Sequence, residues 1–302
     1  MTHPPAYHAL PLPSGVTISY TTAGSPPHPT LLLLHGFPSS SHQYRNLIPL
    51  LSPHYHILAP SLPGFGLTTT PPAYTFTFSS LTHTISEFLT TLNINSYAAY
   101  IFDYGAPILF RLALQDPSPI KAIISQSGNA YLEGLVPAFW APMRALWASN
   151  NGAKERDDLR SNILSLATTR YQYVAGVPDA DIPLIDPTTW TLDYLQNLQD
   201  KENQEIQLDL LYDYRTNVEL YPKFQAYLRE SQVPLLAIWG KGDPAFGVEG
   251  AKAFKRDVKS ADVRFVDAGH FALETKGGQI GEAVRVWLGK VDMGGMEIGV
   301  GC

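Results

Sequence analysis

Short, almost wholly apolar runs alternate with amphipathic stretches along the first third of the chain. Two such runs are Thr30–Leu34 and Tyr97–Phe102, and their composition is typical of strands that are buried on both faces. The intervening stretches Leu81–Leu92 and Pro107–Leu114 carry apolar residues at helical spacing. Strands that alternate with helices predict an α/β fold with a mostly parallel central sheet flanked by helices. The same pattern predicts strands at Tyr55–Ala59, Ile120–Ser125, Leu235–Trp239 and Val263–Val266, and a helix at Ile280–Leu288.

The strand signal stops near Tyr131 and returns only after Tyr221. Between them the sequence is mostly helical in character and contains Trp140, Trp147 and Trp190 among many tyrosines. We therefore predict a core made of residues 1–130 and 222–302, with a helical cap inserted at residues 131–221. The glycine-rich end, residues 294–302, is predicted to fray.

The composition excludes several classes of protein. With 45% hydrophobic and 16% charged residues among 302, the chain does not have the composition of a disordered protein. Its net charge of −6 disfavours a basic surface for nucleic acid. Cys302 is the single cysteine and the nine histidines show no ligand spacing, so we expect no internal disulfide, no metal and no cofactor.

The sequence also argues against membrane insertion and secretion. The longest aliphatic run, Leu31–Leu34, is far too short to span a bilayer. The first 15 residues lack the basic and apolar regions of a signal peptide. We therefore expect a cytoplasmic protein with no membrane span and no nucleic-acid partner, and the sequence leaves room for a homodimer.

An aspartate stands at the turn between a predicted strand and a predicted helix. Asp103 follows Tyr97–Phe102, and Pro107 falls in the first turn of the helix. Ligands of open parallel sheets bind at this end of the strands, and the helix N-terminus favours an ionised carboxylate there. Such a carboxylate can attack carbon as a nucleophile, although an aspartate at this place can also be a simple N-cap. The serine motif Gly-x-Ser-x-Gly is missing from the sequence.

A second loop could supply hydrogen-bond donors to a developing negative charge. His35-Gly36-Phe37-Pro38 follows the predicted strand Thr30–Leu34. We predict an oxyanion hole made of the backbone N–H groups of Phe37 and Tyr104, the residue after Asp103. The alternative is an ordinary glycine-proline loop with a structural histidine.

An acid and a histidine follow the last two predicted strands. Asp243 comes after Leu235–Trp239, and His270 comes after Val263–Val266. An aspartate can orient an imidazole and stabilise its cationic form, so we predict that these two residues form a water-activating pair, with Glu249 and Asp267 as alternative acids. The order nucleophile, acid, histidine is the order of the α/β-hydrolases.

With these motifs in place, nearly the whole chain resembles the α/β-hydrolase superfamily and, within it, the aspartate-nucleophile branch of epoxide hydrolases and dehalogenases. The matching motifs are HGFP at 35–38, LPGFG at 62–66, DYGAP at 103–107, WGKGD at 239–243 and DAGHF at 267–271. Residue 61, often Asp in relatives, is Ser61 here. The resemblance implies an α/β-hydrolase core with a helical cap.

The resemblance also implies roles for tyrosines of the cap. The stretch Asp213–Asn217 is similar to the segment that carries one lid tyrosine of soluble epoxide hydrolases, which points to Tyr214. The stretch Arg170–Tyr173 is similar to the segment carrying the other, which points to Tyr171, with Tyr173 as its competitor. Aromatic packing between cap and core is the alternative for each. His35, Pro38, Tyr173 and Phe271 are expected to contact the substrate.

The function implied is hydrolysis of a small apolar or aromatic epoxide to a diol through an alkyl ester on Asp103. A haloalkane or haloacid dehalogenase is the first alternative. Its relatives use a Trp or nearby arginines where this chain has Tyr104 and Pro107, so the epoxide is favoured. The sequence is also compatible with a specialised biosynthetic hydrolase, an epoxide-opening cyclase or a non-catalytic binding protein on the same fold.

Overall fold

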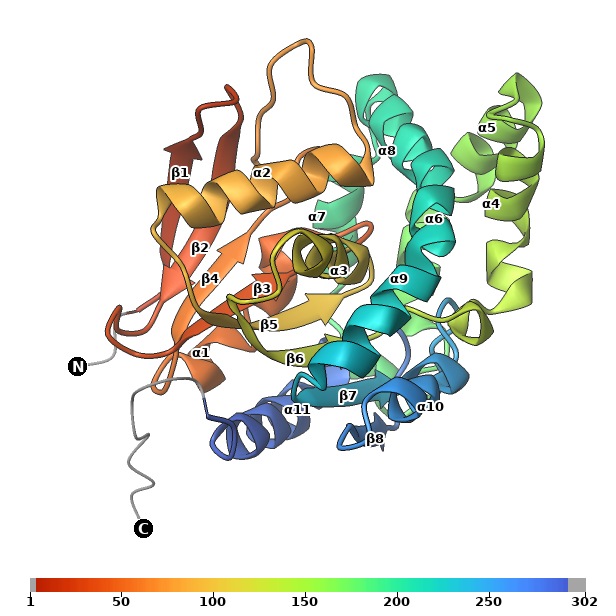
Figure 1. The fold of residues 1–302 in the computed structure, drawn as a ribbon. Helices are drawn as coiled ribbons and strands as arrows, with labels where there is room; N and C mark the ends of the chain where they lie inside the picture. Colours follow the sequence, from red (N-terminus) through yellow and green to blue (C-terminus); the bar gives the residue numbers. More distant parts are fainter. Residues whose placement is uncertain (1–3, 293–302) are drawn as a thin grey trace.

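The computed structural model describes residues 4–292, and its strands form one eight-stranded sheet (Figure 1). The strand order is β1-β2-β4-β3-β5-β6-β7-β8. The strands from β3 to β8 run parallel, whereas β1 and β2 form an antiparallel hairpin at one edge. The predicted α/β class with a mostly parallel sheet is therefore confirmed. The bounds are β1 Ala6–Pro11, β2 Thr17–Ala23, β3 Thr30–Leu34, β4 His56–Pro60, β5 Tyr97–Phe102, β6 Ile120–Gln126, β7 Leu235–Gly240 and β8 Asp262–Val266.

Helices cover both faces of the sheet, which explains why its central strands are apolar throughout. In β3, Leu32 and Leu34 belong to the hydrophobic cluster on the side of α2 (Phe78–Thr91) and α3 (Gly105–Gln115). The alternate residues Leu31 and Leu33 belong to the cluster on the side of α1 (Ile48–Leu51) and α11 (Leu273–Leu288). Because successive side chains of a strand point to opposite faces, each face needs its own apolar set.

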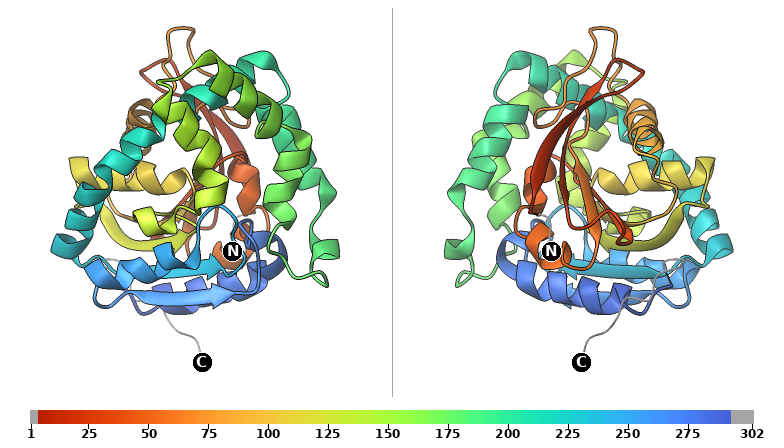
Figure 2. Two further views of the ribbon diagram at one scale, coloured as in Figure 1. Left: turned by 90° about the vertical axis from the view of Figure 1, so that its right-hand side faces the viewer. Right: turned by 90° about the vertical axis from the view of Figure 1, so that its left-hand side faces the viewer.

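Six helices lie between β6 and β7, in the segment predicted to be a helical cap. Figure 2 shows from two sides that they arch over one end of the sheet. The predicted boundary at Tyr221 falls inside the last of them, because α9 continues without a break to Ser231. The helices are α4 Pro137–Ala148, α5 Ala153–Asn162, α6 Leu166–Val174, α7 Pro187–Asn197, α8 Lys201–Asp213 and α9 Arg215–Ser231. The remaining elements are α10 Val248–Asp257 and the 3₁₀ turns η1 Ser41–Tyr44, η2 Leu132–Gly134 and η3 Ile182–Leu184.

Several helices begin earlier than the sequence predicts. In α2 the start is fixed by Thr77, whose side chain accepts a hydrogen bond from the backbone N–H of Ser80. The helix α11 begins at Leu273, seven residues before the predicted start at Ile280, and Lys276 interrupts it with non-helical backbone angles. The predicted fraying of residues 294–302 falls outside the described residues. Within residues 4–292, we find no helix with the length and apolar character needed to cross a bilayer.

Candidate active site

Asp103 lies in the tight turn between β5 and α3. Its φ of 46° is in the left-handed region, which is uncommon for a residue with a side chain and typical of a nucleophile elbow. Two glycines make room for this turn. A Cβ atom at Gly36 would overlap the Asp103 side chain, and one at Gly105 would overlap the backbone carbonyl of Leu34. The glycines of the HGFP and DYGAP motifs are thus required by close approach of the two loops.

The two predicted oxyanion donors converge on one oxygen of Asp103. Its Oδ1 accepts hydrogen bonds from the backbone N–H of Phe37 at 2.8 Å and from that of Tyr104 at 2.6 Å. Burial raises the pKa of Asp103 to about 6, although the neighbouring His270 and the two N–H donors act in the opposite direction. The carboxylate is therefore mostly ionised at neutral pH and has one oxygen held by the protein.

His270 and Asp243 form a buried hydrogen-bonded pair. The distance from His270 Nδ1 to Asp243 Oδ2 is 2.9 Å. Asp243 Oδ1 accepts from the backbone N–H groups of Ala245 and Phe246, each at 2.9 Å. The same Oδ2 that faces His270 also accepts from the hydroxyl of Ser127 at 2.6 Å. Four hydrogen-bond partners thus hold one carboxyl group in place.

The pKa of His270 reflects opposing influences. Burial by itself lowers it, but the charge and hydrogen bond of Asp243, together with the charge of Asp103, give a net rise. The alternative acids contact surface lysines instead. Asp267 pairs with Lys241 at 2.7 Å, and Glu249 pairs with Lys252 at 2.8 Å.

Two tyrosines of α9 and its N-terminal flank lie side by side in the interior. The hydroxyl oxygens of Tyr214 and Tyr221 are 3.3 Å apart, and both side chains are buried. Burial raises the pKa of each, and the charge of Asp103 raises both further, so both hydroxyls lie within its electrostatic reach. The Asn129 amide donates to Tyr221 at 3.3 Å. Sequence reasoning missed Tyr221, although seven residues make about two helical turns and place it on the face of Tyr214.

The structure does not bring Tyr171 to this site. Its side chain is 51% exposed on α6, so it does not face the buried Asp103. Tyr173 is buried and stacks on Phe271, with ring centroids 3.9 Å apart and an interplanar angle of 2°. The Tyr173 hydroxyl donates to Asp193 at 2.5 Å. The partner of Tyr214 is therefore Tyr221 rather than either tyrosine of the segment at residues 170–173.

His35, predicted to contact the substrate, is held by hydrogen bonds within the protein. Its ring is fully buried, Nε2 accepts from the backbone N–H of Leu62 at 2.9 Å, and Nδ1 lies 3.1 Å from the carbonyl of Gly36. Burial lowers its pKa to about 4. Both ring nitrogens are thus engaged, and the neutral imidazole ties the HGFP and LPGFG loops together. Next to it, the carbonyl of Pro38 accepts from the Asn197 amide at 2.7 Å.

Aromatic rings surround the polar groups of the site. Trp140 packs on Tyr214 with centroids 4.6 Å apart, and Phe246 packs on His270 at 5.8 Å. The indole N–H of Trp140 donates to the carbonyl of Ala245 at 2.9 Å. No set of three or more His, Cys, Asp or Glu side chains within residues 4–292 is arranged to hold a metal ion.

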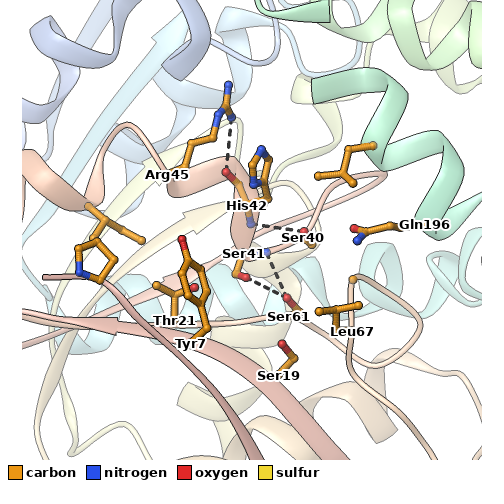
Figure 3. A pocket seen from close by; sticks show the side chains of 14 residues that line it. Tyr7, Ser19, Thr21, Ser40, Ser41, His42, Arg45, Ser61, Leu67 and Gln196 are labelled. Atoms are coloured by element: carbon orange, nitrogen blue, oxygen red, sulfur yellow. Dashed lines mark hydrogen bonds between the residues drawn. The ribbon is translucent and has the colours of Figure 1, made fainter. Parts of the chain in front are cut away.

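A separate pocket has a volume of about 180 Å³. Figure 3 shows it between the β1–β2 hairpin, which supplies Tyr7 and Ser19, and α7, which supplies Gln196. Its polar lining is largely paired within the protein. The Ser61 hydroxyl donates to Ser41 at 3.0 Å (Figure 3), and Arg45 forms an ion pair with Glu274 at 2.7 Å. None of the predicted site residues lines this pocket.

Fold and comparisons with known proteins agree on the class. The chain belongs to the alpha/beta hydrolase fold family, whose model matches residues 29–277. It is 47% identical over 272 residues to an uncharacterized hydrolase of Saccharomyces cerevisiae, covering 89% of this chain and 92% of that protein. It is 25% identical to a haloalkane dehalogenase of Mesorhizobium japonicum, covering 91% and 89% of the two chains. A crystal structure of a haloalkane dehalogenase from Bradyrhizobium elkani matches with a TM-score of 0.75 at 19% identity, covering 94% and 98%.

Proposed function

We propose that this hydrolase is an epoxide hydrolase that converts a small apolar or aromatic epoxide to a diol through an ester on Asp103. The observation that carries the proposal is the buried pair of hydroxyl groups on Tyr214 and Tyr221, 3.3 Å apart and within electrostatic reach of Asp103. An epoxide opens to an alkoxide, which is strongly basic and requires a proton donor. Two tyrosine hydroxyls that experience the charge of the Asp103 carboxylate would supply that proton.

In the first step, the Oδ2 oxygen of Asp103 attacks an epoxide carbon. The ring C–O bond breaks as the new C–O bond forms, and the resulting alkoxide takes a proton from the pair Tyr214 and Tyr221. Oδ1 becomes the carbonyl oxygen of the ester and stays against the N–H groups of Phe37 and Tyr104. These donors therefore serve both as a brace for the nucleophile and as the oxyanion hole of the second step.

In the second step, His270 takes a proton from water, and the hydroxide attacks the ester carbonyl carbon of Asp103. Asp243 stabilises the imidazolium that forms. Collapse of the tetrahedral intermediate breaks the ester bond, and the leaving diol oxygen takes the proton from His270. The proton left on the regenerated Asp103 carboxyl group returns to the tyrosine pair, so that one epoxide and one water give one diol.

The surroundings of the site favour an apolar substrate. Phe37, Trp140 and Phe246 present rings close to Tyr104, Tyr214 and His270. Apolar and aromatic walls with a few placed polar groups are typical of small-molecule sites. No cofactor takes part in the steps proposed.

Dehalogenation is the second candidate function, because a haloalkane dehalogenase is among the relatives. Halide is a weak base that needs N–H donors more than a proton. The indole N–H groups nearest Tyr214 are already used, that of Trp140 by Ala245 and that of Trp147 by Leu211. The two phenolic hydroxyls favour the epoxide over the halide.

The proposal is tested by a single turnover with enzyme in excess over a terminal aryl epoxide in ¹⁸O-water. The first diol should carry unlabelled oxygen from Asp103, and label in that diol would contradict the mechanism. A His270→Gln variant should accumulate an ester of the added epoxide mass on the peptide that holds residue 103. Asp103→Asn added to His270→Gln should abolish the adduct. Asp267→Asn added to His270→Gln is the matched control and should retain it. Halide release from short haloalkanes would instead favour the second candidate.

A further inference from the structure

One short loop after β6 contacts both the Asp243–His270 pair and the Tyr214–Tyr221 pair of the proposed mechanism. Ser127 donates its hydroxyl to Asp243 Oδ2 at 2.6 Å, on the same oxygen that faces His270. Two residues later, Asn129 donates its amide to the hydroxyl of Tyr221 at 3.3 Å. Both side chains are buried. The two groups that the reaction uses in different steps are therefore supported from the same three-residue segment.

The backbone of residues 127–129 is constrained by an unusual torsion angle and by close packing. Ser127 has a φ of 54°, a left-handed conformation that a residue with a side chain adopts at a cost. A Cβ at Gly128 would lie 2.9 Å from the Ser125 hydroxyl and 3.0 Å from the Ile101 side chain, so a larger residue would have to displace these neighbours. The Ser125 hydroxyl in turn donates to the carbonyl of Gly128 at 2.6 Å. The backbone is thus held tightly against the end of β5, next to Asp103.

Hydrogen-bond polarity gives Asn129 a specific effect. Its Nδ2 group also donates to the carbonyl of Tyr131 at 2.7 Å, and its Oδ1 accepts from the Tyr131 N–H at 3.2 Å. The amide orientation is fixed by these two contacts, so the group facing Tyr221 is a donor. Tyr221 must accept from it, and its own proton is then directed toward Tyr214 or toward a ligand.

We infer that Ser127 and Asn129 are positioning residues that serve one chemical step each, Ser127 the hydrolysis of the ester and Asn129 its formation. This inference rests on the proposed function. Ser127 and His270 both form hydrogen bonds with Asp243 Oδ2. The bond from Ser127 therefore limits how strongly this oxygen stabilises a proton on the imidazole. Asn129 keeps the proton of Tyr221 available for the opening epoxide.

For Ser127 the test is the variant Ser127→Ala, with Ser52→Ala, at a buried serine that ends α1, as matched control. Loss of a hydrogen bond to a charged group should slow ester hydrolysis roughly 10- to 100-fold and leave ester formation unchanged. The pKa of His270, followed by NMR on enzyme labelled at its histidines, should rise in Ser127→Ala and stay unchanged in Ser52→Ala. Ser127→Gly removes the same hydroxyl without the left-handed strain, so it should be more stable than Ser127→Ala yet equally slow.

For Asn129 the test is Asn129→Asp, which keeps the shape but replaces the donor by an acceptor. Ester formation should fall roughly tenfold or more, with the His270 pKa and the rate of ester hydrolysis unchanged. Tyr221→Phe should affect the same step and provides the comparison if Asn129→Asp is unstable. Each variant is measured by rapid quench with enzyme in excess, and folding is checked by urea unfolding.

The outcomes separate this inference from the proposed function. A wild-type enzyme that forms no ester refutes the epoxide mechanism, whereas the NMR titration still tests whether Ser127 acts on His270. If folded Ser127→Ala and Ser127→Gly leave both the His270 pKa and ester hydrolysis unchanged, the role of Ser127 is overturned. If Asn129→Asp and Ser127→Ala slow the same step, the assignment of one step to each residue is wrong.

Discussion

Removal of the Tyr221 hydroxyl should slow formation of the ester while leaving its hydrolysis intact. The variant Tyr221→Phe keeps the buried ring and deletes one of two hydroxyls, 3.3 Å apart, that we propose as proton donors to the alkoxide. In enzymes that stabilise an oxyanion with preorganised donors, loss of one donor costs about 2.7–4 kcal/mol, or roughly 100- to 1000-fold in rate. We expect a loss of that size in the first step.

The same change should also lower stability. Tyr221 accepts from Asn129 at 3.3 Å and pairs with Tyr214 at the same distance. A buried donor left without its acceptor costs about 1–3 kcal/mol, and because both bonds are long we expect a value near the lower end. Urea unfolding of the variant therefore accompanies the kinetics, so that a loss of folded enzyme is not counted as a loss of rate.

The assay is a rapid-quench single turnover on a terminal aryl epoxide, with ester and diol followed separately. Tyr171→Phe is the matched control, since its side chain is 51% exposed on the cap and should leave both steps unchanged. Tyr214→Phe should resemble Tyr221→Phe. A folded Tyr221→Phe enzyme that forms the ester within about threefold of the wild-type rate would refute the assignment of the acid pair, since that is under 1 kcal/mol.

Three further outcomes follow from burial and close packing. The pKa of Asp103 is raised to about 6, and its carboxylate must be ionised to attack. The rate of ester formation in a single turnover should therefore fall about tenfold per pH unit below pH 6. A rate that begins to fall only near pH 4 would contradict the role of Asp103 as the nucleophile. Gly36→Ala places a methyl group on the Asp103 side chain, so it should destabilise the fold by about 1–3 kcal/mol in urea unfolding and abolish adduct formation. Burial raises the pKa of Asp193 to about 7, so its stabilising protonated form is fully present below about pH 4 and is lost as the pH rises through 7. Between pH 4 and pH 8, the free energy of unfolding of Asp193→Asn should therefore rise by up to about 4 kcal/mol relative to wild type. Free energies of unfolding that run parallel over this range would exclude the prediction.

The parallel part of the sheet could be predicted because its strands are short apolar runs that alternate with helical stretches. The strands β3 and β5 have the bounds that their apolar runs predict, and β6, β7 and β8 differ by a residue at their ends. The residues of β3 and β5 are buried almost throughout, and the charged residues Lys121 of β6 and Arg264 of β8 stand at partly buried positions, so the apolar signal stays visible. Placing Asp103, Asp243 and His270 at one edge needed only the rule that parallel strands end together.

The β1–β2 hairpin shows where this reasoning fails. Most of Ala6–Pro11 is exposed at the edge of the sheet, so no hydrophobic pattern is required of it. Its place is fixed by pairing with β2, which in turn pairs with β4. Such long-range backbone pairing leaves little trace in local sequence.

The cap is harder to interpret from sequence for a different reason. Sixteen tyrosines offer many matches to a lid motif, and only packing decides which of them reach the interior. Tyr221 belongs to no motif, and only the helical period of α9 places it on the same face as Tyr214, two turns earlier. Ser127 and Asn129 carry no motif, since their importance depends on which loop lies next to β6.

In the proposed mechanism, formation of the ester lowers the pKa of His270 and so prepares this histidine for the second step. Burial lowers the pKa of His270, while Asp243 and Asp103 raise it. Formation of an ester on Asp103 would remove one of these two negative charges and leave burial and Asp243 unchanged. The pKa of His270 must then fall, which makes the neutral, proton-accepting imidazole more abundant in the intermediate than in the free enzyme. A titration of His270 in an Asp103→Asn variant, where the same charge is absent, should show this lower pKa, and an unchanged value would mean that the two groups are not coupled.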